Sequence, residues 1–279
     1  MFQLQAFLSS GVGSIEYDPT ALYRATSEQT HPSPLPLAVM IINKSALVFA
    51  SVFPFVAQKH RVQMLNHFAE CIKLAKSSRQ EAIQINIQTA LLGALKTLAE
   101  SKMNLGTEEV RKLVVASIFS TLNHSNPLIR YASAESIGRC VQIINDGKFL
   151  SEITQQCFEK LRTARDALTR TGYSLAIGSI HHYVVGMGSV QQLKTNISLL
   201  LALAEDHSSP SVQIWALHAL TLIAESGGPM FRSYVEPTLN QCLKILLVLP
   251  PSLIDVYQSI GKCLSALITT IGPEFQVGL

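Results

Sequence analysis

The chain has 279 residues, of which 48% are hydrophobic and 15% are charged, and its formal net charge is +3. These proportions exclude a disordered or solvating tail, and the length fits one large domain or two ordinary ones. Five widely spaced cysteines exclude a disulfide-stapled secreted module and favour a reducing compartment. Aromatic residues are scarce at 7%. Small aliphatic side chains therefore supply the core, which indicates an all-helical protein.

The first 36 residues differ in composition from the rest. Residues that interrupt regular structure recur there, namely Gly11, Gly13, Asp18, Pro19, Pro32, Pro34 and Pro36. We therefore expect a loop or linker over 1–36, with a short helix over 19–25 at most. Residues 1–10 have no basic start and only a short apolar stretch, so they do not read as a signal peptide.

An apolar run over 37–57 reaches the length of a membrane span. Lys44 lies near its middle and Pro54 interrupts its end. A central lysine costs about 2.5–3.5 kcal/mol on insertion into a bilayer. The run is therefore interpreted as a buried or half-buried helix over 37–53 that caps the first repeat.

Internal similarity recurs about every 40 residues. An aliphatic residue precedes a small one at Gly93, Gly138, Gly178, Thr221 and Gly261, and we call these five positions the ladder. Prolines at Pro127, Pro210 and Pro250 and arginines at Arg130 and Arg170 recur in the same alignment. This spacing suits helix pairs of the HEAT or armadillo type, with about 40–47 residues per unit. Glycine is unfavourable within a helix, so the ladder glycines are interpreted as points of close helix–helix approach.

The second unit shows the helix pattern. Thr107 precedes two glutamates, which is favourable at a helix N-terminus, and apolar residues then recur at three- and four-residue spacing. Asn126 and Pro127 predict a turn followed by a second helix over 128–144. Corresponding breaks predict units over 58–105, 106–147, 148–187, 188–228 and 229–275. The predicted fold is an all-α, right-handed α-solenoid of about five helix pairs, an armadillo-like superhelix.

No catalytic, metal-binding or cofactor-binding motif is found. His67 and Cys71 are four residues apart without further ligands, and His181 and His182 point to different sides of a helix. The Gly-Met-Gly sequence over 186–188 has no preceding strand and no P-loop lysine, so it is interpreted as a turn between units. We expect no cofactor and no enzymatic activity. A hydrolase or metal enzyme would need a constellation that the linear sequence hides.

Basic residues surround the third turn within a unit. Lys160, Arg162 and Arg165 are a candidate partner-contact surface for an acidic peptide or a lipid headgroup. The alternative is a solvated surface, with Arg130 and Arg170 bonding neighbouring units from one shared register. No aromatic residues for base stacking are evident nearby, which disfavours single-stranded nucleic acid.

Several runs resemble the family of large HEAT repeat-containing protein 5 proteins. They are GSIEYDP over 13–19, TARDALTRTGYSLAIGSI over 163–180, SPSVQIWALHAL over 209–220, VEPTL over 235–239 and ALITTIGPE over 266–274. The runs extend over nearly the whole chain and are more specific than generic repeat patterning. The family's proteins are far longer, so the resemblance implies an internal segment.

The resemblance also implies a non-catalytic role in membrane traffic. The family is associated with aftiphilin and gamma-synergin and, through them, with adaptor protein complex 1 and clathrin. The expected location is the cytosol, with association to the trans-Golgi network, endosomes and clathrin-coated vesicles. A karyopherin-like or nucleic-acid-associated scaffold is the alternative, since HEAT arrays also serve there.

Overall fold

The structure is a computed structural model that describes residues 37–275 except 185 and 187, without the side chains of 271–275. The predicted linker over 1–36 therefore lies outside the described residues. Within them every regular element is helical. In chain order they are α3 (Leu37–Val52), η2 (Phe53–Phe55), α4 (Gln58–Leu74), α5 (Ser77–Glu100), α6 (Glu108–Phe119), α7 (Pro127–Ile144), α8 (Gly147–Thr163), α9 (Ala167–Tyr183), α10 (Val190–Ala204), α11 (Pro210–Gly227), η3 (Gly228–Phe231), α12 (Arg232–Val248) and α13 (Ile254–Phe275).

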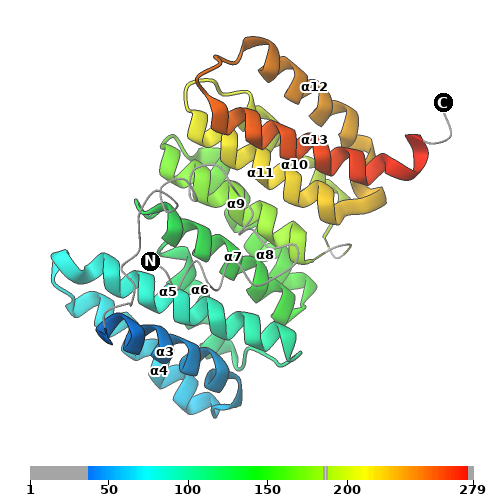
Figure 1. Ribbon diagram of the computed structural model, residues 1–279. Helices are drawn as coiled ribbons and strands as arrows, with labels where there is room; N and C mark the ends of the chain where they lie inside the picture. Colours follow the sequence, from blue (N-terminus) through cyan, green and yellow to red (C-terminus); the bar gives the residue numbers. More distant parts are fainter. Residues whose placement is uncertain (1–36, 185, 187, 276–279) are drawn as a thin grey trace.

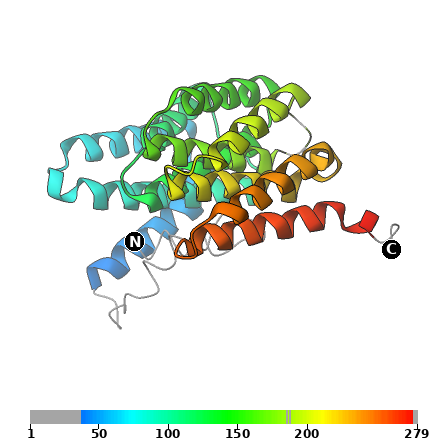
Figure 2. The ribbon, with the colours of Figure 1, turned by 90° about the horizontal axis from the view of Figure 1, so that it is seen from above.

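The helices form two stacked layers. In the inner layer α3, α5, α7, α9, α11 and α13 follow one another, and each packs against the next. The outer layer contains α4, α6, α8, α10 and α12, and each of these also packs against the inner helix that follows it. The pairs succeed one another along the array in sequence order (Figures 1 and 2). The fold is an α-solenoid, as the forty-residue periodicity predicts.

Local sequence signals begin and end these helices. Side chains accept a backbone N–H bond at five N-termini, from Thr107, Asn126, Asp146, Asp166 and Ser189. Pro127 and Pro210 are the first residues of α7 and α11. A backbone N–H at this position would have no partner within the helix, so proline fits there without loss of a hydrogen bond. The third proline does not match this pattern. Pro250 lies in the turn after α12, and α13 begins only at Ile254.

The ladder lies in the inner layer. A Cβ at Gly138 would lie 2.2 Å from Ser179 Oγ, and a Cβ at Gly178 would lie 2.8 Å from Ala219 Cα. At these two positions glycine permits close approach to the next inner helix. Gly93 is buried in α5. At Gly261 no atom lies within 4 Å of such a Cβ, so close packing within the described chain does not explain this glycine.

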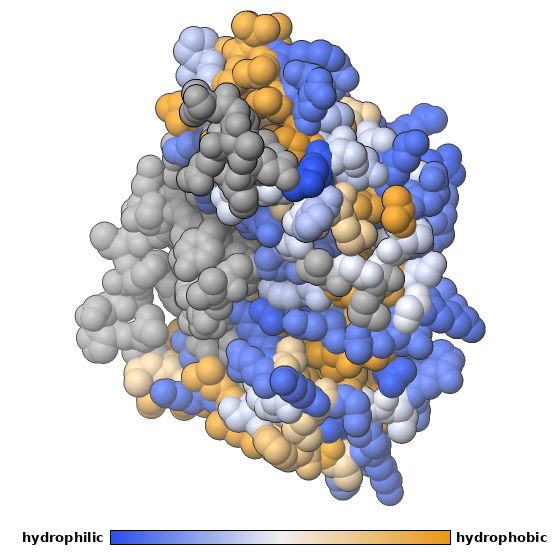
Figure 3. Space-filling model, turned by 90° about the vertical axis from the view of Figure 1, so that its right-hand side faces the viewer, coloured by the Kyte–Doolittle hydropathy of each residue, from blue (hydrophilic) through white to orange (hydrophobic). Residues whose placement is uncertain are grey.

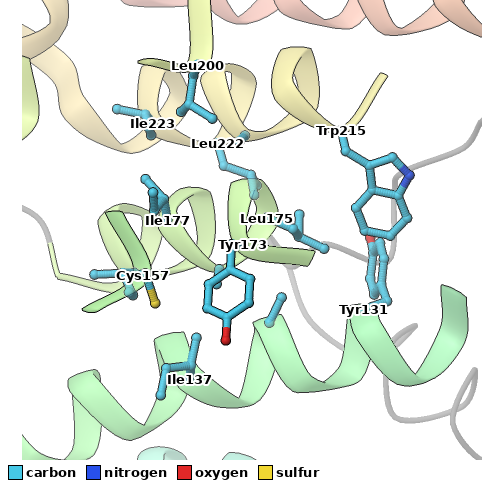
Figure 4. Packing of buried hydrophobic residues seen from close by; sticks show 14 of the residues in the cluster. Tyr131, Ile137, Cys157, Tyr173, Leu175, Ile177, Leu200, Trp215, Leu222 and Ile223 are labelled. Atoms are coloured by element: carbon cyan, nitrogen blue, oxygen red, sulfur yellow. The ribbon is translucent and has the colours of Figure 1, made fainter. Parts of the chain in front are cut away.

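Aliphatic side chains fill the space between the layers, with few aromatic contacts. Tyr131 of α7 and Trp215 of α11 meet edge to face, with ring centroids 5.7 Å apart (Figure 4). Both rings are almost fully buried. They therefore connect two inner helices that are separated in the stack by α9.

Helix α3, which contains the long apolar run, is mostly exposed. In α3 only Ala46 and Ala50 are buried, and Phe49 stacks on Phe53 and Phe68 at 5.2 and 5.0 Å. The expected burial is therefore limited to the stripe that faces α5. Over Leu37–Phe55 the helical stretch is long and apolar enough to cross a membrane by length and composition, and 22% of it is buried.

Replacing either ladder glycine by alanine tests the close-approach interpretation. Gly138→Ala and Gly178→Ala should each lower the free energy of unfolding by about 1–2 kcal/mol, because overpacking outweighs the gain in helix propensity. Urea denaturation with circular dichroism measures this change. If both variants are instead more stable than the wild type, the glycines do not serve helix packing.

Candidate interaction surfaces

The predicted basic surface lies around the turn between α8 and α9. Lys160, Arg162 and Arg165 are all exposed, and they lie within six residues of one another. Arg162 donates to Glu159 on its own helix, with Nη2 2.6 Å from Oε2. This ion pair is exposed, so it contributes little to stability and leaves the surface open to a partner.

The two arginines of the shared register hold turns in place. Arg170 donates to the Ala164 carbonyl at 3.1 Å and to Asp206 Oδ2 at 2.8 Å. Asp206 belongs to the next unit, as expected. Arg130 differs, because its Nη1 donates to His124 O and Ser125 O, both in its own turn, at 2.6 and 2.9 Å. The expectation that Arg130 hydrogen-bonds the neighbouring unit was therefore wrong.

Burial has an electrostatic consequence at Arg130. Desolvation lowers the pKa of its guanidinium to about 10, which still leaves it charged at neutral pH. Its guanidinium carbon lies 5.7 Å from the ring centroid of Trp215. In the fourth unit Gln213 occupies the same register and donates to Ala204 O at 3.0 Å. In three units the side chain at this repeat position, Arg130, Arg170 or Gln213, therefore donates a hydrogen bond to a backbone carbonyl before its helix. The sequence pattern had indicated this position only for the two arginines.

The histidines that the structure describes lie apart from one another or have separate partners. No group of three or more metal-ligating side chains occurs in the part of the chain that the structure describes. His67 Nε2 lies 3.5 Å from Cys71 Sγ on the surface of α4. His181 Nε2 lies 2.9 Å from Asn196 Nδ2, whereas the ring of His182 meets that of Tyr183 edge to face. The two adjacent histidines therefore have separate surroundings.

A groove of about 620 Å³ lies between α6 and α8 and has a mixed lining. Four of its charged residues pair along their own helices, Lys112 with Glu108 at 2.7 Å and Lys148 with Glu152 at 3.9 Å. Val115, Phe119 and Phe149 add an apolar part to the lining. Charges of both signs alternate around this groove, so it does not select strongly for one sign of ligand.

A second groove of about 620 Å³ follows α3 and is almost entirely apolar. Its lining includes Leu37, Met40, Ile41, Val48 and Val52, which we call the α3 face. These side chains are between 44% and 71% exposed, with Leu37 at 71% and Val48 at 62%. Hydrophobic side chains gather at the lower end of the array in Figure 3, where α3 and α4 lie, and again at its upper end. A contiguous exposed apolar patch of this kind marks an interaction site.

One charged residue lies within the α3 face. Lys44 also lines the groove and is exposed, and no carboxylate of the described chain forms a salt bridge with it. The groove holds aliphatic side chains, one ammonium group and Ser45, without an acid–base pair. This composition can bind an apolar helix or peptide, and sequence reasoning missed it because the same run was weighed only as a core helix against a membrane span.

Acid sensitivity should follow from His181. Desolvation lowers the pKa of His181 to about 4, whereas an unfolded histidine titrates near 6.5. The unfolded chain therefore takes up a proton between these pH values and the folded chain does not. The free energy of unfolding should fall by up to about 1.4 kcal/mol per pH unit as the pH drops from 6.5 towards 4, and the full stability should be present above 6.5.

Urea denaturation at several pH values measures this slope. His181→Asn should flatten the slope between pH 6.5 and 4, and the exposed His60→Asn serves as the matched control. An unchanged slope in His181→Asn would assign the acid sensitivity to other groups.

Comparison with known proteins finds a distant relative and similar folds. No family model matches the chain. The chain is 28% identical over 250 residues to "Protein SWEETIE" of Arabidopsis thaliana, a match that covers 88% of this chain and 11% of that protein. The chain therefore spans only about a ninth of the length of this relative.

Similar solved structures include designed and engineered proteins. A designed armadillo repeat protein in complex with the peptide (KR)4 is 16% identical, with a TM-score of 0.39, over 81% of this chain and 92% of that one. An engineered protein is 14% identical, with a TM-score of 0.38, over 81% of this chain and 97% of that one.

Proposed function

We propose that this chain is a non-catalytic scaffold that binds protein partners in intracellular membrane trafficking. The partners are proteins of the adaptor protein complex 1 and clathrin machinery, including aftiphilin and gamma-synergin. Its place is the cytosol, with association to the trans-Golgi network, endosomes and clathrin-coated vesicles. The observation that carries the binding role is the α3 face, an exposed apolar groove on a rigid helical array.

The geometry favours binding over chemistry. The helices of the array bury their apolar faces against neighbours, whereas the α3 face stays exposed. An exposed Val or Ile is available to a partner without any rearrangement of the core. Burial of such side chains at an interface supplies affinity, concentrated in a few residues near its centre.

The trafficking role rests on sequence resemblance. The runs shared with the HEAT repeat-containing protein 5 family extend from Gly13 to Glu274, and two of them fall in α9 and α11. The run over 163–180 includes the basic Arg165 and the ladder residue Gly178, so it spans both a surface turn and a packing contact. Because the resemblance includes both surface and core residues, it supports common descent of the whole segment with that family, including its binding role.

A charge introduced into the α3 face tests the proposal. Val48→Glu should lower the recovery of aftiphilin and the adaptor complex at least tenfold in pull-downs with the purified chain, because a carboxylate would be desolvated at the contact. Val190→Glu is the matched control, since Val190 is 69% exposed on α10 and Val48 is 62% exposed on α3.

Circular dichroism melts should show both variants folded. Equal recovery by Val48→Glu, Val190→Glu and the wild type would exclude the α3 face as the contact. No recovery of either partner by the wild type would contradict the trafficking role of this segment.

The exposed basic turn favours a second candidate, a karyopherin-like or nucleic-acid-associated scaffold. Lys160, Arg162 and Arg165 could contact phosphate or acidic peptide groups. Filter binding with salt titration discriminates the two functions, because phosphate contacts weaken steeply as salt rises. Arg165→Glu should then reduce binding, whereas Arg79→Glu, an exposed arginine on α5, should not.

A further inference from the structure

Helices α7, α9 and α11 each have one side that faces none of their packing partners among the described helices. Each packs against the inner helices before and after it and against outer helices. The remaining side, opposite the outer layer, is called the inner face. Three contacts identify the side chains that point towards the outer layer: Ser133 Oγ lies 2.7 Å from Thr121 Oγ1 just after α6, the Tyr173 ring centroid lies 6.2 Å from that of Phe119 on α6, and Gln213 donates to Ala204 O on α10 at 3.0 Å.

Large side chains on the inner face are buried. Residues two positions apart on a helix point about 200° away from each other. Leu175 and Trp215, which follow Tyr173 and Gln213 by two positions, therefore point to the inner face, and so does Tyr131, two positions before Ser133. Their exposure is nevertheless 0% for Leu175, 2% for Trp215 and 1% for Tyr131.

The two aromatic rings confirm this placement. Tyr131 on α7 and Trp215 on α11 meet edge to face at 5.7 Å, although α9 lies between their helices (Figure 4). The outer layer occupies the other side of α9, so the rings meet across its inner face. The guanidinium carbon of Arg130 lies 5.7 Å from the Trp215 centroid and shields part of that ring. A tryptophan or tyrosine ring on an open face keeps part of its surface exposed, so further residues cover both rings.

We propose that residues 1–36 of this chain lie along the inner face, with the stretch over 15–23 covering Tyr131 and Trp215. The inner face is then a peptide-binding surface whose ligand belongs to the same chain. It is separate from the α3 face and does not depend on the proposed trafficking role.

The length of the segment permits this contact. Consecutive inner helices run in the same direction, because an outer helix returns the chain between them. Leu37 therefore lies at the same end of the array as the first turns of α7 and α11, which contain Tyr131 and Trp215. The rings meet over α9, three inner helices from α3, or about 30 Å away at the usual 8–10 Å between packed helices. Residues 24–36 span about 40 Å at about 3.1 Å per residue, so Tyr23 reaches the rings.

The other residues outside the described part of the chain do not reach. Residues 185 and 187 follow the last turn of α9, at the far end of the inner helices. Residues 276–279 follow α13 at that same end, and four residues extend over about 14 Å at most. Helix α13 is 22 residues long, or about 33 Å. Within this chain, only the segment over 1–36 is placed to cover the rings.

The composition of the segment fits the two tasks. Its last part contains Pro32, Pro34 and Pro36, which favour an extended backbone that can cross several helices. The stretch over 15–23 contains the aromatic residues Tyr17 and Tyr23 together with two aliphatic residues. Tyrosine rings pack well against other aromatic rings and keep their hydroxyl group at the surface.

Tryptophan fluorescence of the full chain tests the cover directly, because Trp215 is the only tryptophan. The double variant Tyr17→Ser, Tyr23→Ser should raise the acrylamide quenching constant about threefold, since the indole loses its cover. The matched control is Phe2→Ser, Phe7→Ser, which removes two aromatic rings from the same segment outside the stretch. It should quench as the wild type does, and circular dichroism should show both variants folded. Unchanged quenching in the tyrosine variant, or an equal rise in the control, would overturn the proposal.

Photo-crosslinking identifies the occupant. With p-benzoylphenylalanine at Tyr23 of the full chain, mass spectrometry should find adducts with the first turns of α7, α9 or α11. An equal mixture of isotope-labelled and unlabelled chains should give adducts within one chain. The same probe at Phe55, which is 73% exposed beside α3, should give no adduct on the inner face. Mixed-isotope adducts would assign the cover to a second copy and overturn the proposal, as would the absence of adducts from Tyr23 to these helices.

Discussion

The close approach of successive inner helices is the constraint on which the array depends. At Gly138 and Gly178 the following helix lies where a side chain would otherwise be, within 3 Å of a would-be Cβ. A methyl group there forces two helices apart, and because every pair is stacked on the last, the displacement is passed along both layers. The spacing of the ladder thus sets the spacing of the pairs, and the pairs set where every surface residue lies.

Much of this fold follows from the sequence because its signals are local or periodic. The forty-residue recurrence, the caps at Thr107 and Asn126 and the starts at Pro127 and Pro210 depend on neighbours within one unit. Contacts between units are harder to predict. A Cβ at Gly172 would lie 1.6 Å from Leu122 O, a close approach to the α6–α7 turn that no repeat register indicates. Pro250 lies at the turn between the two helices of its unit, as its register indicates, but the exact start of α13 at Ile254 was not predictable from it.

The interaction surfaces were only partly predictable, for a related reason. Charge reveals Lys160, Arg162 and Arg165 as a surface, because unpaired charges avoid burial. Charge does not separate these residues from Arg130 and Arg170, which hold turns in place through backbone carbonyls. Hydropathy detects the apolar run of α3 but does not tell whether a core, a bilayer or a partner covers it. The number of helices packed against α3 decides that question, and this number is a tertiary property.

The two ends of the array have different chemistry, which bears on how it assembles. The α3 end presents bulky aliphatic side chains and the ammonium group of Lys44. The α13 end exposes Ile254 and Ile268 on α13 and Leu243 and Leu247 on α12. A head-to-tail contact between two copies through such ends repeats without closing and builds filaments. A distinct partner that covers either apolar end therefore removes this route to self-polymerisation.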